Sequence, residues 1–188
     1  IGSSVEYGDK KSPQKENSFI NIKSLKSSYG RAKLLATNYL LKKNKINSFP
    51  GNVIRFYLVY GPKQDFNRLI PLVIKGCLEN TNFPCSSGKQ YRDFLYVDDA
   101  VNGILKCLEN DKLNGEIVNI GYGRPKRVEK LIKLIKKKIS LGNPIFGKIK
   151  LRKDEINILY PDIKKARNKL NWKPKVEFIK GIGKTIKY

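Results

Sequence analysis

The chain has 188 residues, 40% of them hydrophobic, enough to bury a core in one domain or in a domain with a smaller lobe. It has no histidine and no apolar run of about 18 residues, which excludes zinc sites, histidine-based triads and a membrane-spanning helix. The net charge of +23 comes from lysines scattered through every segment without interleaved aromatic residues, so it indicates compositional bias rather than a nucleic-acid site.

The start of the chain and its cysteines indicate whether the sequence is a fragment and in which compartment the protein lies. The chain begins at Ile1 and contains no methionine, so we expect a fragment that lacks an N-terminal part. No charged segment followed by an apolar one opens it, so no signal peptide is expected. Its three cysteines show no C-x-x-C spacing, and an odd number of cysteines fits reduced thiols in the cytoplasm.

The first half of the chain alternates predicted strands and helices. The opening IGSS is predicted to end a buried strand, and residues 9–23 to form a polar loop. A helix is predicted from Ser27 to Lys43, a strand over 52–59, and a second helix over 66–79.

The second half continues this alternation. A strand is predicted over 92–97, with Asp98 or Asp99 as the N-cap of the next helix, and another strand over 115–121. Pro125 is predicted at the first position of an amphipathic helix, and the last forty residues are expected to form a short helical lobe. Together the elements predict an α/β fold with a parallel sheet.

The sequence SSYGRAK places Tyr29 four residues before Lys33, so the two side chains would share one face of a helix. The spacing alone selects nothing, because it recurs at four other pairs: Tyr7/Lys11, Tyr39/Lys43, Tyr122/Lys126 and Tyr160/Lys164. The surroundings favour Tyr29. Small residues flank it, and Ser3 and Ser4 are expected at the carboxyl edge of a strand, where α/β sheets bind ligands.

Such a group has a recognisable chemistry. Tyrosine has an ordinary pKa of about 10, and a neighbouring lysine cation lowers it by stabilising the phenolate. The phenolate can then take a hydroxyl proton, while a serine hydroxyl donates a hydrogen bond to the same substrate oxygen.

Five blocks in order make the chain resemble the extended short-chain dehydrogenase/reductases, the NAD-dependent sugar-nucleotide epimerase/dehydratase family: GSSVEYG, SSYGRAK, VIRFYLVYGPKQ, RDFLYVDD and NIGYG. They span residues 2 to 123, and RKDE…LNWKP extends the likeness to about residue 174. The family's glycine-rich loop, G-x-x-G-x-x-G, is absent from the chain. The resemblance implies that a missing N-terminal half carries most of the NAD contacts.

The resemblance assigns roles to residues of this chain. Ser3, Tyr29 and Lys33 match the catalytic serine, tyrosine and lysine of the family. Tyr29, Lys33 and Tyr57 match positions that contact the cofactor, which is NAD with NADP as an alternative.

Two arginines match family residues that hold the substrate's diphosphate, namely Arg92 and Arg152. A guanidinium suits phosphate oxygens, and the chain has only eight arginines among its 39 basic residues. Leu58 departs from the family, because many members carry an asparagine there that contacts the diphosphate.

The implied fold is the C-terminal part of a Rossmann-type doubly wound parallel sheet with a smaller α/β substrate-binding lobe. Residues 1–63 would belong to the Rossmann domain and residues 64–188 mainly to the lobe, with 115–140 as a possible return to the sheet.

The implied function is a sugar-nucleotide epimerase, acting at sugar C4 by hydride transfer to NAD and back. A 4-keto-sugar reductase or dehydrogenase is the close alternative, and a nucleic-acid-binding protein the distant one. A dehydratase is disfavoured because Ser4 and Val5 stand where family dehydratases place acids, and strand alternation would turn Glu6 to the other face. We expect a nucleotide-diphosphate sugar as substrate, a homodimer in the full-length protein, and no nucleic acid or membrane as partner.

Overall fold

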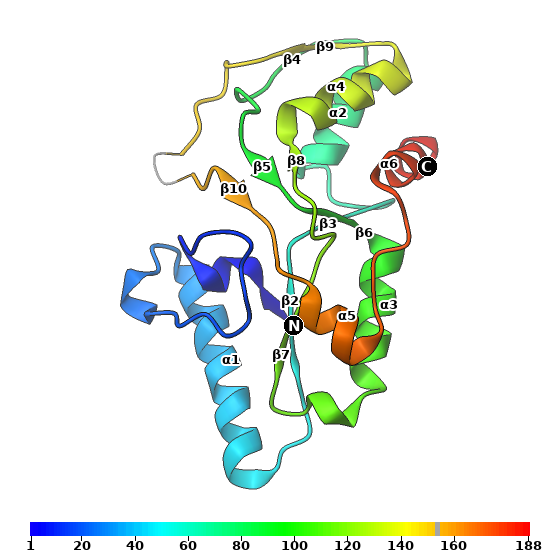
Figure 1. Cartoon of the computed structure of the whole chain (residues 1–188). Helices are drawn as coiled ribbons and strands as arrows, with labels where there is room; N and C mark the ends of the chain where they lie inside the picture. The colour runs from blue at the N-terminus through cyan, green and yellow to red at the C-terminus, as the bar shows by residue number, and fades with distance from the viewer. Residues whose placement is uncertain (153–154) are drawn as a thin grey trace.

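The computed structural model describes residues 1–152 and 155–188. Its centre is a parallel sheet in the order β1-β2-β7, made of β1 (Gly2–Ser3), β2 (Val53–Phe56) and β7 (Ile117–Ile120). Helix α1 (Ser28–Asn47) lies on one side of this sheet, and α3 (Val97–Leu108) and α5 (Lys164–Leu170) lie on the other (Figure 1). Such two-sided cover explains why β2 and β7 consist mainly of buried residues.

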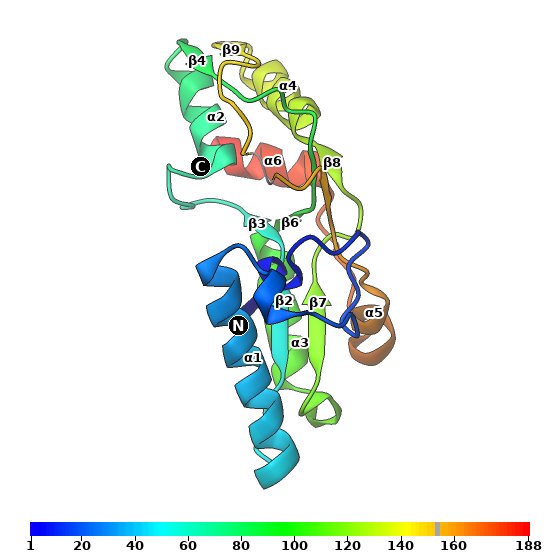
Figure 2. The same cartoon turned by 90° about the vertical axis from the view of Figure 1, so that its left-hand side faces the viewer.

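A second group of elements lies at the carboxyl end of this sheet (Figure 2). Strands β3 (Leu58–Tyr60) and β6 (Phe94–Tyr96) form a parallel pair there. Helices α2 (Leu69–Leu78), α4 (Val128–Ile139) and α6 (Phe178–Lys187) share a hydrophobic core with this pair. Short pairings complete the group: β4 (Asn82–Pro84) with β9 (Asn143–Ile145), and β5 (Tyr91–Arg92) between β10 (Ile158–Leu159) and β8 (Lys126–Arg127).

The predicted parallel α/β architecture is present, but the single strand predicted over 52–59 is wrong. It breaks at Tyr57 into β2 and β3, which pair with different partners. Strand β7 pairs with β2, while the following helix α4 shares the core of α2 and α6. The domain boundary at residue 63 stays a prediction.

Three predictions of local structure were also wrong. Helix α3 begins at Val97, so Asp98 and Asp99 lie in its first turn, and Asp99 accepts hydrogen bonds from the amides of Lys175 and Val176, both at 2.9 Å. Pro125 precedes β8 instead of opening α4, which begins at Val128. The chain after Ser3 is a 3₁₀ helix, Ser4–Tyr7, so strand alternation does not apply to Glu6.

The last forty residues do not form a lobe of their own. Ala166 and Leu170 of α5 pack in the core of the central sheet, whereas Phe178 and Ile182 of α6 pack with α2 and α4. Helical periodicity shows which face of a helix is apolar, but the core that receives this face depends on the whole chain. Cys77, Cys85 and Cys107 are buried free thiols. In the described part of the chain, every helix is too short or too polar to cross a membrane.

Asp93 joins β6 to the turn that follows β7. Its carboxylate accepts hydrogen bonds from the amides of Tyr122 and Gly123, both at 2.7 Å. Burial raises the pKa of Asp93 to about 6, although these amides favour its charged form. The turn after β7 is therefore held by one buried side chain.

Replacing Asp93 with alanine leaves these amides without their acceptor. We expect the free energy of unfolding of the full-length protein to fall by about 2–4 kcal/mol, measured by urea denaturation. Asp98→Ala is the matched control, because its carboxylate is exposed and lies 3.7 Å from Lys184, and we expect a change within about 0.5 kcal/mol. Equal losses for both variants would contradict the role of Asp93.

Candidate active site

A pocket of about 620 Å³ lies where β1 ends and where the chain passes from β2 to β3. This is the carboxyl end of the central parallel sheet, the edge at which open α/β sheets bind their ligands. Its wall consists of Ser3, Ser4, Val5, Tyr29, Tyr57, Leu58, Val59, Tyr60, Gln64, Arg68, Leu69, Ile70 and Phe94. Three of the six predicted site residues, Ser3, Tyr29 and Tyr57, therefore meet around one cavity.

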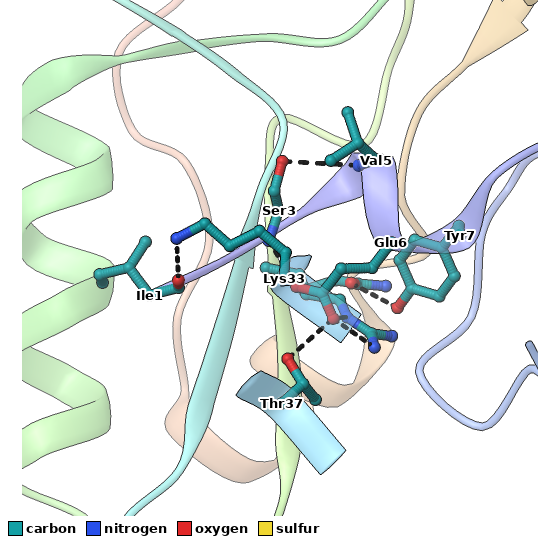
Figure 3. Close-up of polar contacts among 9 residues, drawn as sticks. Ile1, Ser3, Val5, Glu6, Tyr7, Lys33 and Thr37 are labelled. Atoms are coloured by element: carbon teal, nitrogen blue, oxygen red, sulfur yellow. Dashed lines mark hydrogen bonds and ion pairs between the residues drawn. The ribbon is translucent and has the colours of Figure 1, made fainter. Parts of the chain in front are cut away.

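Ser3 is the last residue of β1 and the N-cap of the 3₁₀ helix. Its hydroxyl oxygen accepts a weak hydrogen bond from the amide of Val5 at 3.5 Å (Figure 3), so its O–H stays available to donate. Ser4, which we expected at the same ligand-binding edge as Ser3 but to which we assigned no role, also lines the pocket.

Tyr29 lies in the first turn of α1, whose N-cap Ser27 accepts a hydrogen bond from the amide of Gly30 at 3.2 Å. The tyrosine side chain is 56% exposed and faces the pocket. A Cβ on Gly30 would lie 2.9 Å from the carbonyl oxygen of Val5. We predicted that small residues beside Tyr29 let another molecule approach the helix. Gly30 instead allows the backbone of Val5 to pack against α1, which brings the helix close to the end of β1.

Lys33 follows Tyr29 by one helical turn, with its Nζ 5.8 Å from the centre of the tyrosine ring. The ammonium donates a hydrogen bond to the carbonyl oxygen of Ile1 at 3.0 Å (Figure 3). The pair Tyr39/Lys43 on the same helix has nearly the same geometry, 5.6 Å, but Tyr39 lines a different pocket. Position in the fold, rather than the local pair, distinguishes Tyr29.

Tyr57 stands at the break between β2 and β3 and lines the pocket, although the residue is nearly buried. Its hydroxyl donates a hydrogen bond to Oε1 of Gln14 at 2.8 Å. Burial raises the pKa of Tyr57 far above its usual range, so this phenol stays neutral. Tyr57 can therefore offer the surface of its ring to a ligand, but its hydroxyl proton is already donated to Gln14.

The predicted diphosphate arginines are outside the pocket wall. Arg92 of β5 is buried, its Nη1 donates to the carbonyl of Tyr91 at 2.8 Å, and its Nη2 forms an ion pair with Glu155. Burial lowers the pKa of Arg92, and Glu155 opposes this effect. Arg152 is exposed, and its carbonyl accepts from the amide of Glu155 at 3.1 Å. Within the RKDE motif, Lys153 and Asp154 lie outside the described residues.

Two other wall residues bear on substrate binding. Leu58, the departure from the family pattern, lines the pocket and offers no hydrogen bond there. Arg68, at the N-cap of α2, also lines the pocket and was missed. The scarcity of arginine, which we applied to Arg92 and Arg152, would have been the signal for Arg68 as well.

A Rossmann-type parallel sheet with a tyrosine, a lysine and a serine at its carboxyl edge defines a class of nicotinamide-dependent enzymes. The family model described as "NAD dependent epimerase/dehydratase family" matches residues 1–121. The chain belongs to this family, and the predicted fold class is confirmed.

The chain is similar to a putative UDP-glucose 4-epimerase of Methanocaldococcus jannaschii, with 33% identity over 167 residues, covering 86% of this chain and 53% of the relative. Among solved structures it resembles UDP-glucose 4-epimerase from Thermotoga maritima with UDP-glucose, at a TM-score of 0.90 and 29% identity, covering 100% of this chain and 61% of that one. It also resembles a UDP-glucuronic acid 4-epimerase mutant from Bacillus cereus, in complex with a fluorinated substrate analogue and NAD. That likeness has a TM-score of 0.89 and 27% identity, and covers 100% and 59% of the two chains. The chain thus spans about half the length of the curated relatives it matches.

Proposed function

We propose that this chain forms the catalytic and substrate-binding part of an NAD-dependent epimerase that acts at C4 of a nucleotide-diphosphate sugar. The observation that carries the proposal is the meeting of Ser3, Tyr29 and Tyr57 around one pocket, with Lys33 one turn behind Tyr29. The resemblance to two 4-epimerases, one with UDP-glucose and one with a UDP-uronic acid analogue and NAD, supports the same class of substrate.

The pocket residue Tyr57, and Lys33 one helical turn from the pocket residue Tyr29, fit the nicotinamide end of NAD. The ring of Tyr57 offers a flat surface, and the ammonium of Lys33 lies near a phenol and a carbonyl oxygen, where it can also donate to ribose hydroxyls. The glycine-rich pyrophosphate loop is absent from these 188 residues, so other parts of the protein would hold that group. When bound, NAD would accept a hydride from the sugar carbon and return it.

The chain's own residues would handle the proton. The hydroxyl of Tyr29, with the Lys33 ammonium one helical turn away, would take the proton of the sugar hydroxyl and later give it back. The free O–H of Ser3 donates to the same oxygen and stabilises the negative charge that develops on it. Arg68 lines the pocket, and its guanidinium would contact an anionic group of the substrate.

The pocket wall argues against elimination of water. Dehydration needs a general acid near the leaving hydroxyl, and Ser4 and Val5 supply none. Glu6, which follows Val5, is fully buried and is not one of the residues of the wall. We therefore keep dehydration as the less favoured reaction.

Product analysis tests the proposal. Full-length protein, NAD⁺ and UDP-glucose or UDP-glucuronate are expected to yield the C4 epimer without net change in NADH, as followed by nuclear magnetic resonance. Mass spectrometry should find no product lighter by one water. Stoichiometric consumption of NADH or NADPH with a 4-keto sugar would establish the reductase instead, and a dehydrated product that disappears in Tyr29→Phe would establish the dehydratase.

We also propose that the full-length protein is a homodimer in a reducing compartment such as the cytoplasm. Helix α1 exposes Leu35, Tyr39 and Ile46, apolar side chains that a second copy would cover. The buried free cysteines are consistent with a reducing compartment. Sedimentation of the full-length protein would test the dimer.

A further inference from the structure

The 3₁₀ helix after β1 carries a carboxylate that the proposed mechanism does not use. Glu6 is 0% exposed, and its oxygens accept hydrogen bonds from three elements. Oε1 accepts from the amide of Ser3 at 2.8 Å (Figure 3). Oε2 accepts from Oγ1 of Thr37 at 2.8 Å and from Nε of Arg55 at 2.9 Å, and Nη2 of the same arginine lies at 2.7 Å. Both carboxylate oxygens therefore accept hydrogen bonds from the protein.

These contacts join the elements that form the pocket. Ser3 ends β1, and Arg55 belongs to β2, where it pairs in register with Gly2. Thr37 lies on α1, one turn beyond Lys33 and two turns beyond Tyr29. A single buried carboxylate thus connects the strand that carries the serine to the helix that carries the tyrosine and lysine.

The surroundings of Glu6 leave space for a carboxylate and hold its counter-ion. A Cβ at Gly2 would lie 2.6 Å from Oε1 of Glu6, so only glycine lets the carboxylate come this near the strand. Arg55 is 1% exposed, and its guanidinium lies 4.4 Å from the ring centre of Tyr7, whose hydroxyl donates to Oδ1 of Asn119 at 2.8 Å. Both members of the Glu6–Arg55 ion pair therefore have further contacts that fix their position.

We propose that Glu6 is a positioning residue for the active site, which acts by holding the backbone of Ser3 so that its hydroxyl faces the pocket at a fixed distance from α1. This inference rests on the proposed function. Charge-assisted hydrogen bonds in a buried site are stronger than neutral ones and tolerate little displacement. A shift of the supporting group of about 1 Å can cost about 100-fold in rate.

Glu6→Gln is the sharpest variant, because it keeps the shape and removes one acceptor. A glutamine has one oxygen, so either Ser3 or Arg55 must face an NH₂ group that cannot accept. In the full-length enzyme we expect kcat to fall about 10- to 100-fold with little change in KM. In a Ser3→Ala background the same change should cost less than about threefold, because the group that it positions is gone.

The matched control is Leu131→Ala, a buried residue in the core of α2, α4 and α6 that is not one of the residues of the pocket wall. It should lower the melting temperature while leaving kcat per folded enzyme unchanged. If Glu6→Gln fails to fold, Thr37→Val removes only the hydrogen bond from α1 at nearly constant volume and should still lower kcat several-fold. Unchanged kcat in the variant that folds, or equal losses with and without Ser3, would overturn the proposal.

Amide hydrogen exchange gives a second readout that needs no turnover. We expect faster exchange at the amide of Ser3 in the Glu6 or Thr37 variant and no change there in Leu131→Ala. If the wild-type protein epimerises no sugar nucleotide, the proposed function fails, and exchange still decides whether Glu6 holds Ser3. Unaltered exchange over residues 1–8 in the Glu6 or Thr37 variant would overturn the positioning role.

Discussion

Replacing Tyr29 with phenylalanine in the full-length protein is expected to lower turnover about 10²- to 10⁴-fold, the usual contribution of a positioned acid–base group. The substitution removes the ionisable hydroxyl and keeps the ring, which faces the pocket beside Ser3 and Tyr57. Binding of the sugar nucleotide should change little, because the loss lies in proton transfer. The measurement is the initial rate of C4 epimer formation at saturating substrate.

Tyr39→Phe provides a matched control on the same helix. Tyr39 is exposed, like Tyr29, and has a lysine at nearly the same distance from its ring, 5.6 Å against 5.8 Å. It lies at another pocket, so its hydroxyl is far from the proposed chemistry. We expect a change of less than about twofold, and equal losses for the two variants would refute the assignment of Tyr29.

This pair of tyrosines shows what the sequence could and could not predict about the site. Spacing gave five Y-x-x-x-K candidates, and the structure confirms that two of them have nearly the same local geometry. The end of β1, 26 residues upstream of Tyr29, separates it from Tyr39, because it brings Ser3 to the cavity that Tyr29 lines. In the sequence, the order of the five motif blocks was what indicated that Ser3 and Tyr29 belong to one site.

For the arginines, the sequence did not predict the contacts that the side chains make. The family resemblance, supported by the rarity of arginine, assigned Arg92 to the substrate diphosphate, and this role stays a prediction. Its ion-pair partner Glu155 is 63 residues away and could not be inferred from the motif or from composition. The same holds for Asp99, whose acceptor oxygens are used by amides 76 and 77 residues later rather than by its own helix. Helices with a clear apolar period were predictable, whereas side-chain partners depend on contacts distant in sequence.

Glu6 shows how a correct outcome can follow from a wrong reason. Alternation along a strand predicted that it points away from the sugar, and it is indeed absent from the pocket wall. The chain there is a 3₁₀ helix, and the carboxylate is drawn inward by Arg55, a residue 49 positions later. A buried charge is retained where a partner of opposite charge is available.

Ser3→Ala is expected to lower kcat about 10²- to 10³-fold, the effect of removing one donor that stabilises developing negative charge on oxygen. The Ser3 hydroxyl oxygen accepts only a weak bond from Val5, at 3.5 Å, so its proton is free for the substrate. Stability should change little, because the bond that holds Ser3 to Glu6 uses the backbone amide and survives the substitution. Single-turnover kinetics and the melting temperature separate the two effects.

Ser4→Ala is the control that tests the choice between neighbouring serines. Both residues line the pocket, so position in the cavity alone does not select one. The family resemblance selects Ser3, and the structure adds a physical reason. The backbone amide of Ser3 donates to the Glu6 carboxylate, which also accepts a hydrogen bond from α1, the helix of Tyr29 and Lys33. A donor fixed in this way loses less freedom when charge develops on the substrate oxygen. We therefore expect Ser4→Ala to cost less than about fivefold in kcat, and a larger loss at Ser4 than at Ser3 would transfer the role of hydrogen-bond donor to Ser4.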